Sequence, residues 1–242
     1  MLTYILLALG AISLTFFLLF RTKEGGLVPA MIKTLTSLLF VATALSAAVN
    51  NYIVTGTLGV ERLTFMALVI LGLVTGLIGD LTLDLKITYQ VSNLHHSDIY
   101  TFIGMGAFGV GHILYVIAVA LYFGFSAWTI LIAAAATALI FTVSIFLLKM
   151  KFGKFLIPAI AYSFLLILFL ASTVAAGLIT AFTVSTILLV TGAALFLASD
   201  LVLSMTYFDG NDSRVMIVVN HVLYYGAQFA IALSLYYLGT SL

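Results

Sequence analysis

Eight stretches of about 20 predominantly apolar residues fill almost the whole chain. An α-helix rises ~1.5 Å per residue and the hydrocarbon core of a bilayer is ~30 Å thick, so each stretch predicts one membrane-spanning helix. The predicted spans are residues 2–20, 27–49, 63–85, 99–122, 125–148, 155–179, 183–206 and 215–238. We therefore expect an all-α polytopic membrane protein with eight transmembrane helices, forming a single membrane domain over residues 1–242.

Composition agrees with this fold class and excludes several functions. Only 7% of the residues are charged, against roughly 25% in soluble domains. The net charge of +1 argues against a nucleic-acid partner, because phosphate binding needs clustered basic residues. The chain has no cysteine, which excludes disulfides, thiolate catalysis and cysteine-ligated metals.

Basic residues predict the orientation in the membrane. The first stretch has no basic residue ahead of it, but Arg21 and Lys23 follow it directly, so it predicts a retained helix with its N-terminus outside. Eight spans then place the C-terminus outside as well. This topology leaves Arg62 alone on the outer side and puts the other basic residues inside: Arg21, Lys23, Lys33, Lys86, Lys149, Lys151, Lys154 and Arg214. We expect a multi-pass protein of a cell membrane.

The two halves of the chain share a pattern of rare residues. Each of the two prolines, Pro29 and Pro158, stands just inside the start of a predicted helix. Asp80 precedes a His-x-x-Tyr segment at 112–115, and Asp200 precedes a second one at 221–224. The matching helices are four apart, which predicts a parallel 4+4 internal repeat with halves of about 1–123 and 124–242. The loop expected around Asn93, His95, His96 and Asp98 is longer than its counterpart from Asp209 to Arg214.

Under this topology the polar side chains converge on the cytoplasmic half of the membrane. They are Lys33, Asp80, Asp84, Tyr162, Asp200, Asn220, His221, Tyr224 and Gln228, with His112 near mid-depth. Gly72, Gly76, Asp80 and Asp84 recur every four residues, so they form one helix face that allows close packing and leads to the carboxylates. A polar cavity open to the cytoplasm satisfies these groups. An intramembrane carboxylate costs roughly 2.5 to 3.5 kcal/mol, which favours a functional role for Asp80 and Asp200.

Structural alternatives stay open for other members of this set. Asp84 is compatible with a place at the membrane interface, and Asn220 and His221 with solvation at the inner boundary. Lys33 is compatible with snorkelling to the inner surface.

The residue types favour acid–base chemistry. The sequence has no Gly-x-Ser-x-Gly elbow, no His-Glu-x-x-His helix, no Walker loop and no dinucleotide fingerprint. The spacing of the His and Asp residues is not typical of a metal site, so we expect no metal and no cofactor. Carboxylates with His, Lys and Tyr nearby form a set suited to proton transfer.

These residues also carry a family resemblance over nearly the whole chain. In order, they are Gly79-Asp80, Gly104, Phe108, His112, Tyr115, Gly192, Phe196, Ser199-Asp200, Tyr224 and Gln228. In this pattern the chain resembles the bacterial YhhN proteins and their animal TMEM86 relatives, the lysoplasmalogenases. The family's Lys-Pro-Leu-Thr segment corresponds to Lys33-Thr34-Leu35-Thr36, which keeps the lysine and lacks the proline. Asp84 and His221 lie outside the family pattern.

The resemblance implies hydrolysis of the vinyl ether bond of a lysoplasmalogen, with release of a fatty aldehyde and a glycerophospho-alcohol. Protonation of the alkene carbon is the hard step, so one carboxyl must carry a proton beside another that is ionised. We expect Asp80 and Asp200 to form this pair and His112 to position water or relay the proton. Lys33 would bind the substrate phosphate, while Tyr115, Ser199, Tyr224 and Gln228 would orient the head group or the acids; Asp84, Tyr162, Asn220 and His221 are further candidates.

Two other functions remain compatible with the sequence. Parallel repeats with a polar layer are also found in transporters of small molecules or lipids. A lipid-binding or sensor protein without turnover is the third possibility. A transport path needs polar residues in both halves of the membrane, and the outer half of this chain is nearly bare of ionisable groups.

Overall fold

A computed structural model describes residues 1–21, 26–56, 59–89, 94–208 and 213–239. Eight of its helices are long and apolar enough to cross a membrane, and no strand occurs in these ranges. They are α1 (Leu2–Phe20), α2 (Leu27–Thr55), α3 (Val60–Tyr89), α4 (Leu94–Phe123), α5 (Trp128–Thr142), α6 (Leu156–Ile179), α7 (Val184–Phe208) and α8 (Arg214–Ser234). The fifth span, Trp128–Leu147, is complete only with the π-helical turn that follows α5. The predicted class, an all-α protein with eight transmembrane helices, is confirmed.

Helix ends depart from the prediction where polar residues extend a helix beyond its apolar stretch. α2 continues to Thr55, and α4 already begins at Leu94. His95, His96 and Asp98 therefore lie on the first turns of α4, and their assignment to a loop was wrong. Hydropathy marks the part of a helix inside hydrocarbon, whereas backbone hydrogen bonding continues into the interface. Lys23, Asn93 and Asp209 lie outside the described residues.

The fifth predicted span ends in an irregular segment. α5 passes into a π-helical turn, Val143–Leu147, and a 3-10 turn, Gly153–Phe155, precedes α6. Ser144 of the π-helical turn is buried and lines the cavity described below. Widened π turns inside helices are frequent at functional sites.

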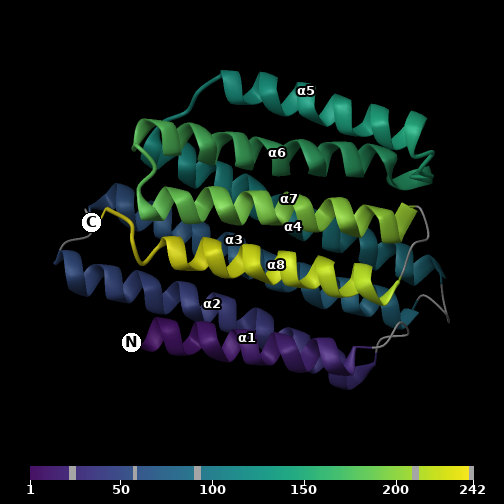
Figure 1. The fold of residues 1–242 in the computed structure, drawn as a ribbon, viewed down its shortest axis with the longest axis horizontal. Coiled ribbons are helices and arrows are strands. Elements are labelled where there is room, and N and C mark those ends of the chain that lie inside the picture. Colours follow the sequence, from purple (N-terminus) through teal and green to yellow (C-terminus); the bar gives the residue numbers. More distant parts are fainter. Residues whose placement is uncertain (22–25, 57–58, 90–93, 209–212, 240–242) are drawn as a thin grey trace.

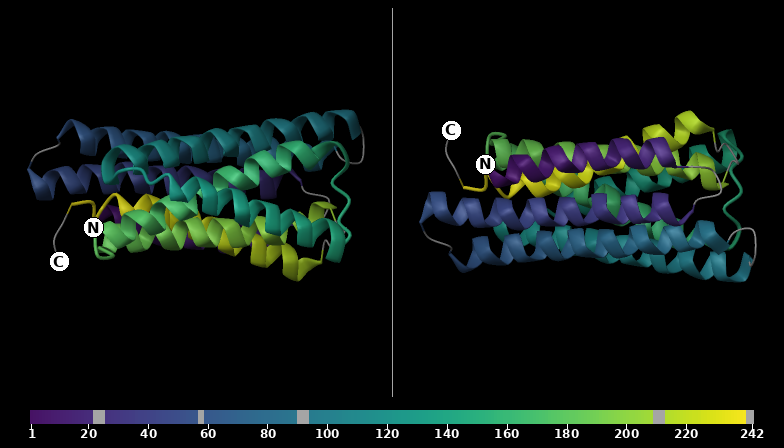
Figure 2. Two further views of the ribbon diagram at one scale, coloured as in Figure 1. Left: turned by 90° about the horizontal axis from the view of Figure 1, so that it is seen from above. Right: turned by 90° about the horizontal axis from the view of Figure 1, so that it is seen from below.

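Six helices form a closed ring, and two lie outside it (Figures 1 and 2). Around the ring the neighbours run α2, α3, α4, α6, α7, α8 and back to α2. α1 packs on α2 and α5 packs on α6, so each half contributes one outer helix followed by three ring helices. This neighbour order is the same in both halves, as the predicted repeat requires; the duplication itself stays a prediction.

The predicted glycine stripe of α3 packs as expected. A methyl group added at Gly72 would lie 2.3 Å from the ring of Tyr115 on α4, and one at Gly76 would lie 2.6 Å from Nε2 of Gln228 on α8. Tyr115 and Gln228 therefore fit against α3 only because glycine, which has no side chain, occupies positions 72 and 76. The stripe brings α4 and α8 against α3 in the two turns that precede Asp80.

The ends of the chain and most of its basic residues lie at opposite ends of the bundle. α1 begins and α8 ends at the left in Figure 1. Arg62 lies at this end too, near Gly239. Which side of a membrane each end faces stays a prediction.

Candidate active site

A cavity of about 580 Å³ occupies the half of the bundle where α1, α3 and α7 end and α2, α4, α6 and α8 begin. Both Asp80 and Asp200 line it. Five further residues from the predicted set line it as well: Lys33, Tyr162, Asn220, His221 and Tyr224. The remaining predicted residues do not line it: Asp84, His112, Tyr115, Ser199 and Gln228. The structure thus brings seven of the twelve candidates to one surface.

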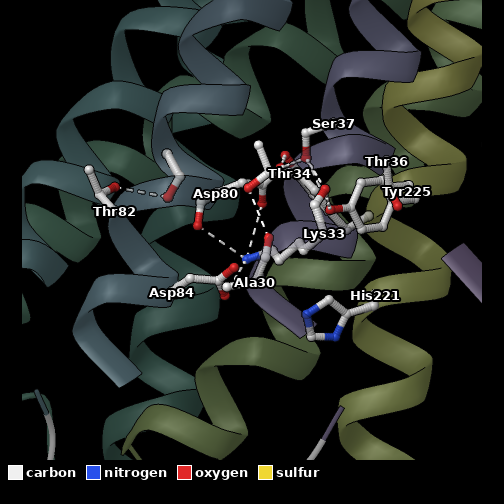
Figure 3. Close-up of polar contacts among 12 residues, drawn as sticks. Ala30, Lys33, Thr34, Thr36, Ser37, Asp80, Thr82, Asp84, His221 and Tyr225 are labelled. Carbon is white, nitrogen blue, oxygen red and sulfur yellow. Dashed lines mark hydrogen bonds and ion pairs between the residues drawn. The ribbon is translucent and has the colours of Figure 1, made fainter. Parts of the chain in front are cut away.

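Lys33 lies at the centre of a buried ion-pair group formed by α2 and α3 (Figure 3). Its Nζ is 3.4 Å from Oδ1 of Asp80 and 3.2 Å from Oδ1 of Asp84, and it donates to the backbone carbonyl of Asp80 at 3.3 Å. Lys33 and Asp80 are only 5% and 3% exposed. The ammonium thus donates two hydrogen bonds, to Asp84 Oδ1 and to the Asp80 backbone carbonyl, and lies within ion-pair distance of the Asp80 carboxylate. Neither surface snorkelling of Lys33 nor a purely interfacial place for Asp84 describes this arrangement.

The second carboxylate oxygen of Asp80 accepts two hydrogen bonds from hydroxyl groups. Ser37 Oγ donates to Oδ2 at 2.6 Å, and the Tyr224 hydroxyl donates to the same atom at 2.8 Å. Ser37 is one helical turn after Lys33, so both side chains share one face of α2. Together with the lysine, these donors favour the ionised form of Asp80.

A chain of hydrogen bonds leads from Tyr224 away from the cavity. Gln228 donates to the Tyr224 hydroxyl at 3.0 Å, and the Tyr115 hydroxyl donates to Gln228 at 3.4 Å. Tyr115 and Gln228 are buried behind the cavity wall. They fix the orientation of Tyr224, and through it that of Asp80, without facing the cavity themselves.

Asp200 has a different set of partners. The Tyr162 hydroxyl donates to Oδ2, and Ser199 Oγ donates to Oδ1 through a longer bond of 3.3 Å. Asn220 donates to the backbone carbonyl of Ser199 at 2.8 Å, which ties α8 to α7 beside the acid. Among the described residues no Lys, Arg or His forms an ion pair with Asp200, and the hydrogen bonds to Asp200 and to Asp80 come from different residues. The two acids thus share a cavity without forming a directly bonded pair.

Two of the four histidines, His112 and His221, adopt the same local geometry. Nδ1 of His112 is 2.8 Å from the carbonyl oxygen of Phe108, and Nδ1 of His221 is 2.7 Å from that of Ile217. A carbonyl only accepts, so in the neutral ring each Nδ1 carries the hydrogen. His221 lines the cavity, whereas His112 is 1% exposed and its Nε2 has no hydrogen-bond partner within the described residues.

Aromatic rings separate His112 from the cavity. The rings of Phe196 and Tyr162 lie edge-on to the imidazole, with their centroids 4.6 and 5.7 Å from the centroid of His112. Both residues line the cavity. Proton relay by His112 stays a prediction, and this geometry gives it no direct contact with a molecule in the cavity.

Sequence reasoning missed several polar residues of this site. Ser37 was recognisable from its spacing to Lys33. Arg21 and Lys86, which line the cavity, indicate only topology in the sequence. Tyr207, whose ring lies 3.2 Å from Nζ of Lys86, has no distinguishing sequence signal.

Apolar side chains complete the cavity on the side of α4, α5 and α6. They include Met105, Ile140, Phe141, Ala159 and Leu166. One cavity therefore joins charged groups from α2, α3 and α7 to an apolar wall, which is the arrangement that an amphiphilic molecule requires.

Comparison with known proteins adds one finding to this geometry. Neither the curated proteins nor the solved structures yield a significant match to the chain. A model of the YhhN family matches residues 28–235, from the first turn of α2 to the end of α8. This match covers most of the chain, including both acids and every residue that binds them. The chain therefore belongs to the YhhN family.

Proposed function

We propose that this protein is a lysoplasmalogenase-like hydrolase that cleaves the vinyl ether bond of a lysophospholipid within the bilayer. One observation carries the proposal: two carboxyl groups with contrasting partners, Asp80 and Asp200, line a single cavity that also has an apolar wall. Family membership is consistent with a hydrolase.

The contrast between the two acids supports different roles for them. Lys33 and two hydroxyl donors favour the ionised form of Asp80. Asp200 receives only hydroxyl donors, and its Oδ1 has one long hydrogen bond. A low-dielectric site without a neighbouring cation favours a neutral carboxyl. We therefore assign the proton to Asp200 and the negative charge to Asp80.

The reaction then follows from general acid catalysis. Asp200 donates its proton to the second carbon of the alkenyl chain, and the first carbon becomes part of an oxocarbenium ion. The carboxylate of Asp80 stabilises this cation electrostatically. Water adds to the first carbon and returns a proton to Asp200, which regenerates the acid. The resulting hemiacetal transfers its hydroxyl proton to the glycerol oxygen as the carbon–oxygen bond breaks, leaving an aldehyde and a glycerophospho-alcohol.

This chemistry requires neither a nucleophilic side chain nor a redox partner, because a vinyl ether is activated by protonation alone. Tyr162 would hold Asp200 in place, and Asn220 would do so through Ser199. Under the predicted topology the cavity opens in the cytoplasmic half of the membrane. Its confinement to one half of the bundle favours hydrolysis over transport.

Aldehyde release from a 1-alkenyl lysophospholipid by the purified protein tests the proposal. Wild-type protein should release aldehyde, while Asp200→Asn and Asp80→Asn should each lose at least ~100-fold of the rate. Asp98→Asn is the matched control, since Asp98 pairs with Lys154 outside the cavity. A 1-acyl lysolipid should remain intact. Full activity in both cavity variants, each shown to be folded, would contradict the mechanism.

A further inference from the structure

Two basic residues at the cavity are not used by the proposed chemistry. Arg21 directly follows α1, and Lys86 is on the last turns of α3 beyond Asp84. Both line the same cavity as the two acids. They are therefore available for a part of the substrate remote from the reacting bond.

Arg21 has the burial and the unused donor of a binding residue. Its side chain is 8% exposed, and its Nε has no hydrogen-bond partner within the described residues. A buried guanidinium nitrogen without a partner is costly, so a bound acceptor would relieve it. The Arg214 guanidinium donates to the backbone carbonyls of Leu18 and Arg21, which fixes the end of α1 and leaves the Arg21 side chain unengaged by that contact.

Lys86 supplies a second cation at the same surface. Its Nζ lies 3.2 Å from the ring centroid of Tyr207, which also lines the cavity. A cation–π contact holds the ammonium without neutralising its charge. No carboxylate pairs with Lys86 among the ion pairs of the described residues.

Lys33 does not offer an equivalent site. Its ammonium already donates to Asp84 and to the backbone carbonyl of Asp80 and is paired with both carboxylates, so an anion in the cavity would have to compete with these two acids. Arg21 and Lys86 retain their charge for an external anion, and a guanidinium is well suited to a phosphate group.

We propose that Arg21 and Lys86 bind the phosphodiester of an amphiphilic substrate, whose hydrocarbon chain lies against the apolar wall of α4, α5 and α6. The choice of a lysophospholipid as ligand rests on the proposed function. The charge of the site selects a phosphate, and the apolar wall selects a lipid over a soluble phosphate. This assignment takes the place of the phosphate-binding role predicted for Lys33.

Equilibrium binding of a 1-O-alkyl lysophospholipid tests this inference without turnover, because a saturated ether is not cleaved by protonation of an alkene. Arg21→Gln and Lys86→Gln should each weaken binding about 10-fold or more. Arg21→Lys should keep part of the affinity. Lys154→Gln is the matched control, since Lys154 is exposed and pairs with Asp98. It should bind like the wild type.

Three further ligands identify what the site recognises. 1-O-alkylglycerol, which lacks the phosphate, should bind the wild type and both cavity variants equally. Glycerophosphoethanolamine and inorganic phosphate should compete only weakly for the wild type. Unchanged lysolipid binding in both variants would overturn the inference, as would an equal loss of lysolipid and alkylglycerol. Strong competition by inorganic phosphate would replace the lipid with a soluble anion and would also overturn it.

Failure of this inference is distinguishable from failure of the proposed function. Arginine-dependent binding without aldehyde release would contradict hydrolysis and leave the phosphate site intact. Aldehyde release together with lysolipid binding that does not depend on Arg21 or Lys86 would support hydrolysis and contradict the phosphate site.

Discussion

Replacement of Lys33 by methionine should be among the most destabilising single changes in this protein. Methionine has a similar length and no charge, so Asp80 and Asp84 would lose their shared cation while Asp80 remained buried. At separations of 3.4 and 3.2 Å and an effective dielectric constant of ~20, each pair has a Coulomb energy of about 5 kcal/mol before desolvation. Breaking such a buried pair from one side typically costs ~3–5 kcal/mol.

The assay is reversible unfolding in mixed detergent micelles, followed by circular dichroism. Lys33→Met should lower the free energy of unfolding by ~3–5 kcal/mol. Lys154→Met is the control, because the Lys154 side chain is 55% exposed where it pairs with Asp98, and its loss should cost at most ~1 kcal/mol.

A double-mutant cycle separates the ion pair from loss of packing. Lys33→Met with Asp80→Asn should be less destabilising than the sum of the single changes by ~1–3 kcal/mol, because the second change removes the stranded charge. The buried ion pair would be refuted if Lys33→Met and Lys154→Met lowered the free energy of unfolding equally and the effects of Lys33→Met and Asp80→Asn were additive.

Two further predictions concern packing and the second acid. Gly72→Ala should lower the free energy of unfolding by ~1–3 kcal/mol, because the new methyl group would overlap Tyr115. Gly106→Ala is the control: no atom lies within 4 Å of the added carbon, so the free energy of unfolding should stay unchanged or rise. Similar values for both variants would contradict the packing of α3 on α4. Tyr162→Phe should lower the rate of vinyl ether hydrolysis about 10-fold in steady-state assays, because Asp200 loses its closest hydrogen-bond donor. Tyr52→Phe, at the opposite end of the bundle, is the control and should have no effect. Equal rates for the two variants would show that the Tyr162 hydroxyl does not act on Asp200.

The helices, and the depth of the site along them, could be predicted from the sequence because both depend on strong local signals. Apolar stretches of about 20 residues have only one stable arrangement in a bilayer, which is a spanning helix. Asp80, Asp200 and Lys33 were rare polar groups at similar predicted depth, so their convergence on one cavity followed from topology. The α4 start at Leu94 was missed because polar first turns carry no hydropathy signal.

The pairing of side chains depended on tertiary geometry and was only partly predictable. Lys33 on α2 forms ion pairs with both Asp80 and Asp84 on α3. Sequence spacing cannot predict such pairs, because it relates residues within one helix and not residues on two different helices. Predicted depth put His112 near the acids, but it could not reveal the rings of Tyr162 and Phe196 in between. In the sequence Arg21 indicates only topology, because the burial of an arginine after α1 depends on how α1 packs against its neighbours.

Isotope incorporation during hydrolysis tests the central claim most directly. When a 1-alkenyl lysophospholipid is hydrolysed in D₂O, protonation at carbon should place one deuterium on the second carbon of the released aldehyde, as measured by mass spectrometry. The account predicts this singly labelled aldehyde from the wild type and its near absence from Asp200→Asn. Equal rates of labelled aldehyde release by the wild type and by folded Asp200→Asn would contradict acid catalysis by Asp200 in this cavity.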